Sequence, residues 1–251
     1  MLISALPAFA GSSQAGGKTY FEADQVIKFA KKLEKTLAAK GAHVAITARV
    51  GRPRKYLPEG VYYTHTAFAV YSEITTADGR NISGYSIYNL YQRNKEPDVS
   101  DLKQDFPVDF TAGCQLLETG VIIPTPDLQK RLLNVIASRT YQRLHNPKYS
   151  VIANPFTSDF QNCTEFVLDI ITAAIYRTDN IRQIKANERA YFEPHPVSVN
   201  PVKLRLGSIF AKGVKLSDHK GSPATATFTT IGGFLKKFNM ASEIITVRAE
   251  E

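Results

Sequence analysis

Three residues of this sequence have the side-chain chemistry that cysteine-based catalysis requires. Cys163 supplies a thiol, His65 an imidazole and Asn89 a side-chain amide. In such catalysis a thiolate attacks an acyl carbon, an imidazole holds and moves the proton, and a polar group orients the imidazole. The backbone N–H of Cys163 could also contribute to an oxyanion hole. These residues predict hydrolysis or transfer of an amide or ester through an acyl-enzyme on Cys163.

Cys163 stands where a helix is expected to begin. Asn162 is a favoured N-cap residue and Glu165 falls at the third helical position, so the two predict a capping box. A thiol at the first helical position lies at the positive end of the helix dipole, which favours the thiolate. Apolar residues follow on more than one face through Ile175, which predicts a helix buried on most sides. We therefore expect an exposed and activated thiol at the mouth of a buried helix.

Cys163 also has two non-catalytic interpretations. Free cysteine is among the most buried residue types, so this thiol could simply pack in the core. The chain contains one other cysteine, Cys114, and the two could form a disulfide in an exported protein. A disulfide would remove the nucleophile, and with it the catalytic hypothesis.

Three segments have the composition of β-strands, namely residues 42–50, 61–71 and 84–92. The turn signal Asp78-Gly79 lies between the last two segments and predicts a hairpin with a long loop. His65 and Asn89 therefore belong to neighbouring strands.

Because side chains alternate along a strand, the sequence shows which residues share a strand face with His65 and with Asn89. His65 shares a strand face with Ala67 and Ala69, whose small side chains leave room for a helix or substrate to approach. Asn89 lies on an otherwise apolar face, so its amide needs a partner if it is buried. A hairpin register centred near Ala77 would place Asn89 opposite His65, although the loop is too long to fix that register.

Four other histidines compete with His65 for the role of base. His43 lies on the neighbouring predicted strand and is the main rival. His145 occurs in a turn sequence, and His195 and His219 fall in loop-like segments. His65 and His43 therefore remain the two candidates.

Two further helices are predicted outside this constellation. An amphipathic helix covers about residues 22–40 and ends at Gly41. Another helix begins with Thr125 as its N-cap and Pro126 at its first position. Both have an apolar stripe on one face, so both are expected to pack on the sheet.

The remaining sequence predicts connections and a C-terminal extension. Residues 95–124 and 180–201 contain several prolines and are expected to be irregular. Strand-like sequence recurs at 202–206 and 224–230, so residues from about 200 to 251 form a β-rich extension. We expect a tail over residues 1–20, followed by a single domain over residues 21–251.

Composition excludes several functional classes. The chain of 251 residues has a formal net charge of +8, but its basic residues are scattered and form no recognised nucleic-acid motif. It lacks HExxH and CxxC patterns, so no metal site is expected. No Gly-rich phosphate loop is present and no cofactor is predicted. No apolar run approaches the roughly 20 residues that a membrane span needs.

The N-terminus resembles the end of a secretory signal peptide. Residues Ala8, Phe9 and Ala10 form a small-x-small pattern before Gly11, which predicts cleavage after Ala10. The segment departs from the usual pattern because it has no basic region and only a short apolar core. We expect an exported protein, located in the periplasm.

Several segments resemble a known bacterial family. The sequence is similar to the domain-of-unknown-function family 2145 at 88–92, 104–107, 120–126 and 152–156. Its segments around His65 and Cys163 also resemble the circularly permuted branch of the NlpC/P60 papain-like superfamily, in which the histidine strand precedes the cysteine helix. The usual His-Gly or His-Trp pair is replaced here by His65-Thr66.

These resemblances imply a fold and a chemistry. They imply an α+β papain-like fold with an antiparallel sheet packed on a central Cys-bearing helix, with Cys163 as nucleophile and His65 as base. Asn89 is assigned as the third member from its strand position alone. The superfamily includes peptidoglycan endopeptidases, amidases and acyltransferases, which implies a peptide or acyl substrate from the cell wall or from lipid.

Two hypotheses therefore stand together. The first is an exported cysteine hydrolase or transferase that acts through Cys163. The second is a non-catalytic envelope protein that keeps the papain-like scaffold for binding or structure. A thiol that reacts at low pH favours the first, whereas a disulfide between Cys114 and Cys163 favours the second.

Overall fold

A six-stranded antiparallel sheet forms the centre of the molecule. The computed structural model describes residues 19–75, 78–197 and 213–249. In spatial order the strands are β4 (Ser100–Asp105), β3 (Asn81–Gln92), β2 (His65–Thr75), β1 (Val44–Arg49), β5 (Glu118–Pro124) and β8 (Ala241–Arg248). The predicted hairpin of β2 and β3 and the antiparallel sheet are confirmed, as is the α+β class.

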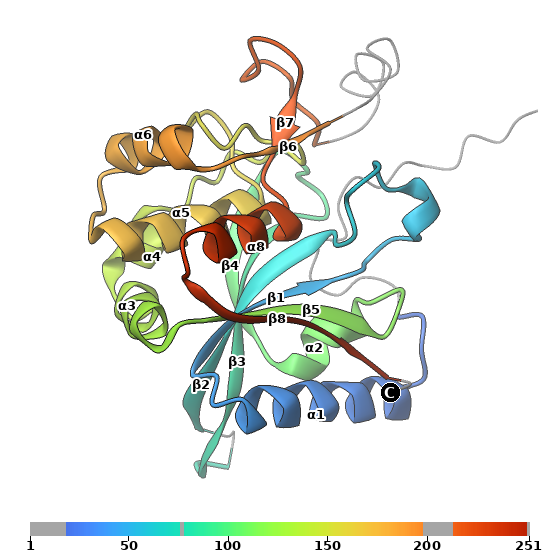
Figure 1. The fold of residues 1–251 in the computed structure, drawn as a ribbon. Coiled ribbons are helices and arrows are strands. Elements are labelled where there is room, and N and C mark those ends of the chain that lie inside the picture. Colours follow the sequence, from blue (N-terminus) through green and yellow to red (C-terminus); the bar gives the residue numbers. More distant parts are fainter. Residues whose placement is uncertain (1–18, 76–77, 198–212, 250–251) are drawn as a thin grey trace, which may run out of the picture.

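Helices cover both faces of this sheet (Figure 1). One face carries α1 (Ala23–Ala39) and α2 (Pro107–Ala112), and the other carries α3 (Pro126–Ile136), α5 (Cys163–Tyr176) and α8 (Phe228–Lys237). The smaller elements are η1 (Arg54–Tyr56), α4 (Arg139–Arg143), α6 (Ile181–Tyr191), β6 (His195–Pro196) and β7 (Ala224–Thr225). The sheet is therefore the middle layer of three.

Strand alternation divides the core into two separate clusters. On β2, Phe68 and Val70 pack with α5, whereas Ala67 and Ala69 pack with α1. Buried apolar residues of α1, among them Leu33, fill the space that the small alanines leave. Each buried strand residue thus packs on one of two covered faces.

The helices that show clear periodicity were predicted correctly. Those at 22–40, after Thr125 and after Asn162 are observed as α1, α3 and α5. Thr125 occupies the N-cap position of α3, but its side chain makes no capping hydrogen bond. Apolar spacing therefore located these helices reliably.

The prediction of an irregular segment over 95–124 is wrong. β4, α2 and β5 all lie there. β4 is a polar edge strand and β5 is buried along its whole length, so neither shows a period of two. α2 is a short helix with Pro107 at its start, and Asp109 accepts a hydrogen bond from the Phe106 N–H at 3.1 Å.

Two predictions in the last third of the chain are also wrong. The supposed connection over 180–201 contains α6, whose N-cap Asn180 accepts hydrogen bonds from the backbone N–H groups of Arg182 and Gln183. The strand-like sequence at 224–230 instead passes from β7 into α8, which Thr227 caps. The C-terminal part supplies β8, which completes the main sheet. Residues 1–18 of the predicted tail at 1–20, and the predicted strand at 202–206, lie outside the described residues.

Gly120 on β5 offers a test of this packing. A Cβ added there would lie 2.7 Å from the rings of both Tyr63 and Phe228, which contact each other edge to face. We expect Gly120→Ala to lower the free energy of unfolding by about 1–3 kcal/mol in urea denaturation. Gly233→Ala is the control, since Gly233 is an exposed position of α8 and nothing lies within 4 Å of its added Cβ. It should raise stability by about 0.5–1 kcal/mol.

Candidate functional site

Cys163 is the first residue of α5, as the sequence predicts. The Asn162 side chain accepts hydrogen bonds from the backbone N–H groups of Thr164 at 3.0 Å and Glu165 at 2.9 Å. Asn162 is thus a true N-cap. The predicted capping box is wrong, because the Glu165 carboxyl group binds Lys185 at 2.8 Å instead.

The Cys163 thiol is less exposed and less acidic than expected. Its residue retains only 4% of its accessible surface. Burial raises the pKa of Cys163, although hydrogen bonds from Thr66 and Thr164 and the positive charge of Arg49 oppose the shift. The free energy lost when a thiolate is removed from water exceeds the stabilisation that the helix N-terminus gives it. The group is therefore a thiol at neutral pH.

The alternative disulfide is not formed in this structure. Both Cys114 and Cys163 are free and buried. Burial raises the pKa of Cys114 to about 12, so this second thiol is inert at neutral pH.

His65 and Asn89 are brought together, with 2.8 Å between His65 Nε2 and Asn89 Oδ1. The amide orientation is determined by its other end, because Asn89 Nδ2 donates to the Ile87 carbonyl at 3.2 Å and to the Asp105 carboxylate at 3.3 Å. Since Oδ1 only accepts, Nε2 must carry the proton, which leaves Nδ1 of the neutral ring as an acceptor. Nδ1 is buried and has no hydrogen-bond partner among the described residues.

The hairpin register explains how the two side chains meet. The strands pair Phe68 with Tyr88 and Thr75 with Asn81, so the register is centred on Asp78 rather than near Ala77. His65 consequently stacks on Tyr91, with 4.9 Å between ring centroids, and it reaches Asn89 diagonally. The His65 pKa lies well below its usual value, first because of burial and then because of the Arg49 charge.

The sheet separates His65 from Cys163. His65 shares its strand face with Ala67 and contacts Phe110 of α2 at 5.9 Å between ring centroids, on the side covered by α1 and α2. Cys163 belongs to the cluster on the opposite face. The next residue, Thr66, turns toward that face and its hydroxyl lies 3.3 Å from the Thr164 hydroxyl. The two proposed catalytic partners are thus brought to the same end of β2 but to different sides.

The four other histidines have contacts elsewhere. His43 is exposed and lies edge to face against Tyr71, at the opposite end of β1 from the site. The remaining contacts pair His145 with the Ser100 hydroxyl, His195 with the Glu59 carbonyl and His219 with the Ile152 carbonyl. None of these contacts involves Cys163, so the rival His43 is not brought to the thiol either.

Cys163 opens onto a cavity of about 160 Å³. Its wall combines Arg52, several hydroxyl groups and a larger set of apolar side chains. The described lining residues are Arg52, Leu57, Pro58, Val61, Tyr63, Thr64, Tyr149, Val151, Ile152, Asn162, Cys163, Thr164, Val197, Thr225, Ala226 and Thr227. Sequence reasoning missed Arg52, whose only signal was its place in the basic loop Gly51-Arg52-Pro53-Arg54-Lys55 after β1.

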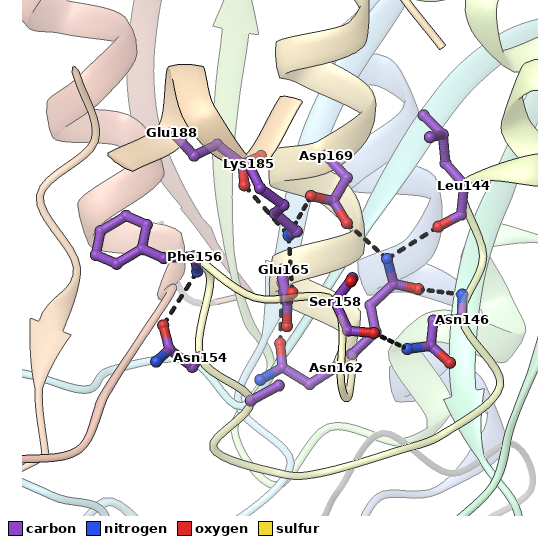
Figure 2. Close-up of polar contacts among 12 residues, drawn as sticks. Leu144, Asn146, Asn154, Phe156, Ser158, Asn162, Glu165, Asp169, Lys185 and Glu188 are labelled. Carbon is purple, nitrogen blue, oxygen red and sulfur yellow. Dashed lines mark hydrogen bonds and ion pairs between the residues drawn. The ribbon is translucent and has the colours of Figure 1, made fainter. Parts of the chain in front are cut away.

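A buried charge cluster lies behind the first turn of α5 (Figure 2). Lys185 of α6 lies 2.8 Å from Glu165, 2.6 Å from Asp169 and 3.2 Å from Glu188. Gln161 also donates to the Asp169 carboxylate at 2.6 Å. These contacts fix the start of α5, and therefore Cys163, relative to α6.

The cluster contains more carboxyl groups than its one ammonium neutralises. Burial raises the pKa of Glu165 to about 8, against the opposing charge of Lys185. Burial and the Asp169 charge also hold the pKa of Glu188 well above its usual range. Burial alone would lower the pKa of Lys185, but the three carboxyl groups raise it well above its usual value. The folded cluster therefore retains protons on its glutamates at neutral pH.

Comparison with known proteins assigns a family. A model of a family described as "uncharacterized protein conserved in bacteria" matches residues 36–235. The chain belongs to the domain-of-unknown-function family 2145. This membership confirms the resemblance to family 2145 found in the sequence, and the match includes both strands of the hairpin and all of α5. No curated protein and no solved structure matches the chain.

Two further properties of this family 2145 chain concern metals and membranes. Within residues 19–75, 78–197 and 213–249, no group of three or more His, Cys, Asp or Glu side chains is arranged to hold a metal ion. Over the same residues no helix combines the length and apolar character needed to cross a membrane.

Removal of Lys185 should expose the cost of the buried carboxyl groups. We expect Lys185→Met in the family 2145 chain to lower the free energy of unfolding at pH 7 by about 3–5 kcal/mol, because it leaves the buried Asp169 carboxylate without its counter-charge. Lys237→Met is the matched control, since Lys237 pairs with Glu193 at the exposed surface. It should change stability little in the same urea titration. If the two variants lost the same free energy of unfolding, the cluster would carry no net charge without Lys185.

The raised pKa of Glu165 predicts a pH dependence. Its folded pKa of about 8 exceeds the reference value of 4.5, so the folded state binds a proton that the unfolded chain releases across this range. The Glu165 contribution to stability must fall as pH rises from 4.5 to about 8 and stay constant outside that window. Glu165→Gln removes the titration. The difference in unfolding free energy between wild type and variant, measured at pH 5, 6.5 and 8, should therefore decrease; a constant difference contradicts the assignment.

Proposed function

We propose that the cavity beside Cys163 is the functional site, and that the protein uses it to bind a small group without cysteine catalysis. In this proposal the chain keeps a papain-like scaffold, with a sheet packed on a Cys-bearing helix, as a binding module. The Cys163 thiol is then one wall of a pocket rather than a nucleophile.

The observation that carries this proposal is the position of His65 on the far face of the sheet. General base catalysis requires the base within about 2.6–3.2 Å of the proton that it removes, or one water molecule away. The His65 ring packs with Tyr91 and Phe110 on the α1 and α2 side, whereas Cys163 packs on the α5 side. The layer of the sheet between them supports a structural role for the His65–Asn89 pair.

The composition of the cavity wall supports the same conclusion. Among the described lining residues there is no histidine, aspartate or glutamate, so no side chain of that wall could accept the thiol proton at neutral pH. Burial also raises the pKa of Cys163. A cavity of about 160 Å³ is close to the about 150 Å³ that holds one benzene molecule. It therefore suits a single amino-acid side chain or the end of a short acyl group.

A second candidate function is the cysteine hydrolase or transferase, with Cys163 as nucleophile, His65 as base and Asn89 as orienting residue. It is favoured by the position of Cys163 at the first residue of α5, where hydrogen bonds from Thr66 and Thr164 lower the thiol pKa in part. The protonation of His65 also suits a base, because its Nδ1 lone pair is available. This function requires β2 to present His65 to the other face.

We extend the proposal to location and ligand source. The Ala8-Phe9-Ala10 pattern and the net charge of +8 support an exported protein in the periplasm, where cell-wall peptides and lipids are the available ligands. On either function the ligand is a peptide or acyl group of the cell envelope. Such groups match the size and the largely apolar wall of the cavity.

Thiol alkylation distinguishes the two functions. For the binding function we expect Cys163 to react with iodoacetamide slowly at pH 6, and faster only as pH passes the free-thiol value of about 8.5. His65→Gln should leave this rate unchanged. The rate is followed by peptide mapping, which separates Cys163 from buried Cys114.

The control variant is His43→Gln, an exposed histidine at the other end of β1. Rapid alkylation at pH 6 that His65→Gln slows at least tenfold, while His43→Gln does not, would establish the hydrolase instead. Circular dichroism on each variant confirms that the compared proteins are folded.

A further inference from the structure

Arg52 is a partly buried cation in the wall of the Cys163 cavity, and no described carboxylate forms an ion pair with it. It follows β1 in the basic loop, and its Nη2 atom is shielded from solvent without a hydrogen-bond partner in the described part of the chain. No ion pair joins it to another described residue. Its neighbour Arg54, by contrast, binds the Glu118 carboxylate. Burial lowers the pKa of Arg52, although the neighbouring Tyr149 of the same wall opposes the shift.

An arginine in this position favours the binding of an anion. The guanidinium group stays protonated at all physiological pH values, so the chain cannot relieve its burial by losing the proton. A shielded N–H group of a cation that has no hydrogen-bond acceptor is costly, and here that group is Nη2. Because the described lining contains no carboxylate, an anion that entered the cavity would meet attraction and no opposing negative charge.

The other residues of the wall restrict the class of ligand that could bear this anionic group. Val61, Val151, Ile152 and Val197 contribute apolar surface. Thr225 already donates to the Ala153 carbonyl at 3.0 Å. One planar guanidinium matches one planar carboxylate through two parallel hydrogen bonds. An ammonium group would face the like charge of Arg52 without a counter-ion.

We infer that the Cys163 cavity binds a small carboxylic acid, with Arg52 holding the carboxylate and the apolar wall holding a body about the size of a benzene ring. This inference rests on the proposed binding function and specifies its ligand class. The carboxylate comes either from a free acid or from the C-terminal residue of a peptide, because both present the same planar anion to the guanidinium.

The test compares each acid with its neutral amide. Benzoate and benzamide represent the free acid, and N-acetylvaline and its amide represent a peptide terminus. By calorimetry on the full chain at pH 7, we expect one acid or both to bind wild type at least tenfold more tightly than the matching amide. Arg52→Gln should remove this preference while changing amide affinity less than twofold. The acid that shows the larger preference identifies the source.

Arg54→Gln is the matched control, because it removes a neighbouring charge that is already bound to Glu118. It should retain the acid preference. Equal affinity for acid and amide in wild type, or a preference that survives in Arg52→Gln, overturns the role of Arg52, as does the absence of binding by both acids. None of these results decides between binding and hydrolysis, which the pH dependence of Cys163 alkylation settles separately.

Discussion

Helices cover both faces of the central sheet, so each buried strand residue packs into one of two separate cores. A shift of one residue along β2 would exchange His65 and Thr66 between these cores. Such a shift would bury the His65 ring against α5, and it would also move Phe68 into the space that α1 now fills beside Ala67. The same packing that makes the sheet stable therefore keeps the imidazole away from the thiol.

The charge cluster around Lys185 has the complementary role of fixing the helix. Glu165 and Asp169 lie one turn apart on α5, and both bind the ammonium group of α6. Asn162 joins the N-terminus of α5 to the Val151 carbonyl at 3.0 Å and to the Thr225 hydroxyl at 3.2 Å. The cavity wall is thus built on anchored backbone, which is what a preformed binding pocket needs.

The sequence located local features well and spatial relations poorly. Apolar periodicity and the capping preference of Asn162 were sufficient to place Cys163 at a helix start, because both depend on neighbouring residues. Alternation correctly grouped His65 with Ala67 and Ala69. It could not reveal which face α5 would cover, since that depends on the packing of distant segments. β5, buried on both sides, and the polar strand β4 carry no alternating pattern, and Arg52 became notable only beside the cavity.

The magnitudes involved explain why a cysteine at a helix start need not be a nucleophile. A helix terminus stabilises a nearby anion by about 0.3–1 kcal/mol when exposed, and by up to about 2 kcal/mol in partly buried geometries. Removing an ion from water costs several kcal/mol. At Cys163 burial therefore outweighs the dipole. A carboxylate held by Arg52 would place a negative charge close to the thiol and raise the thiol pKa further. A thiolate would repel the bound carboxylate, so the pocket binds an acid more tightly when Cys163 is protonated.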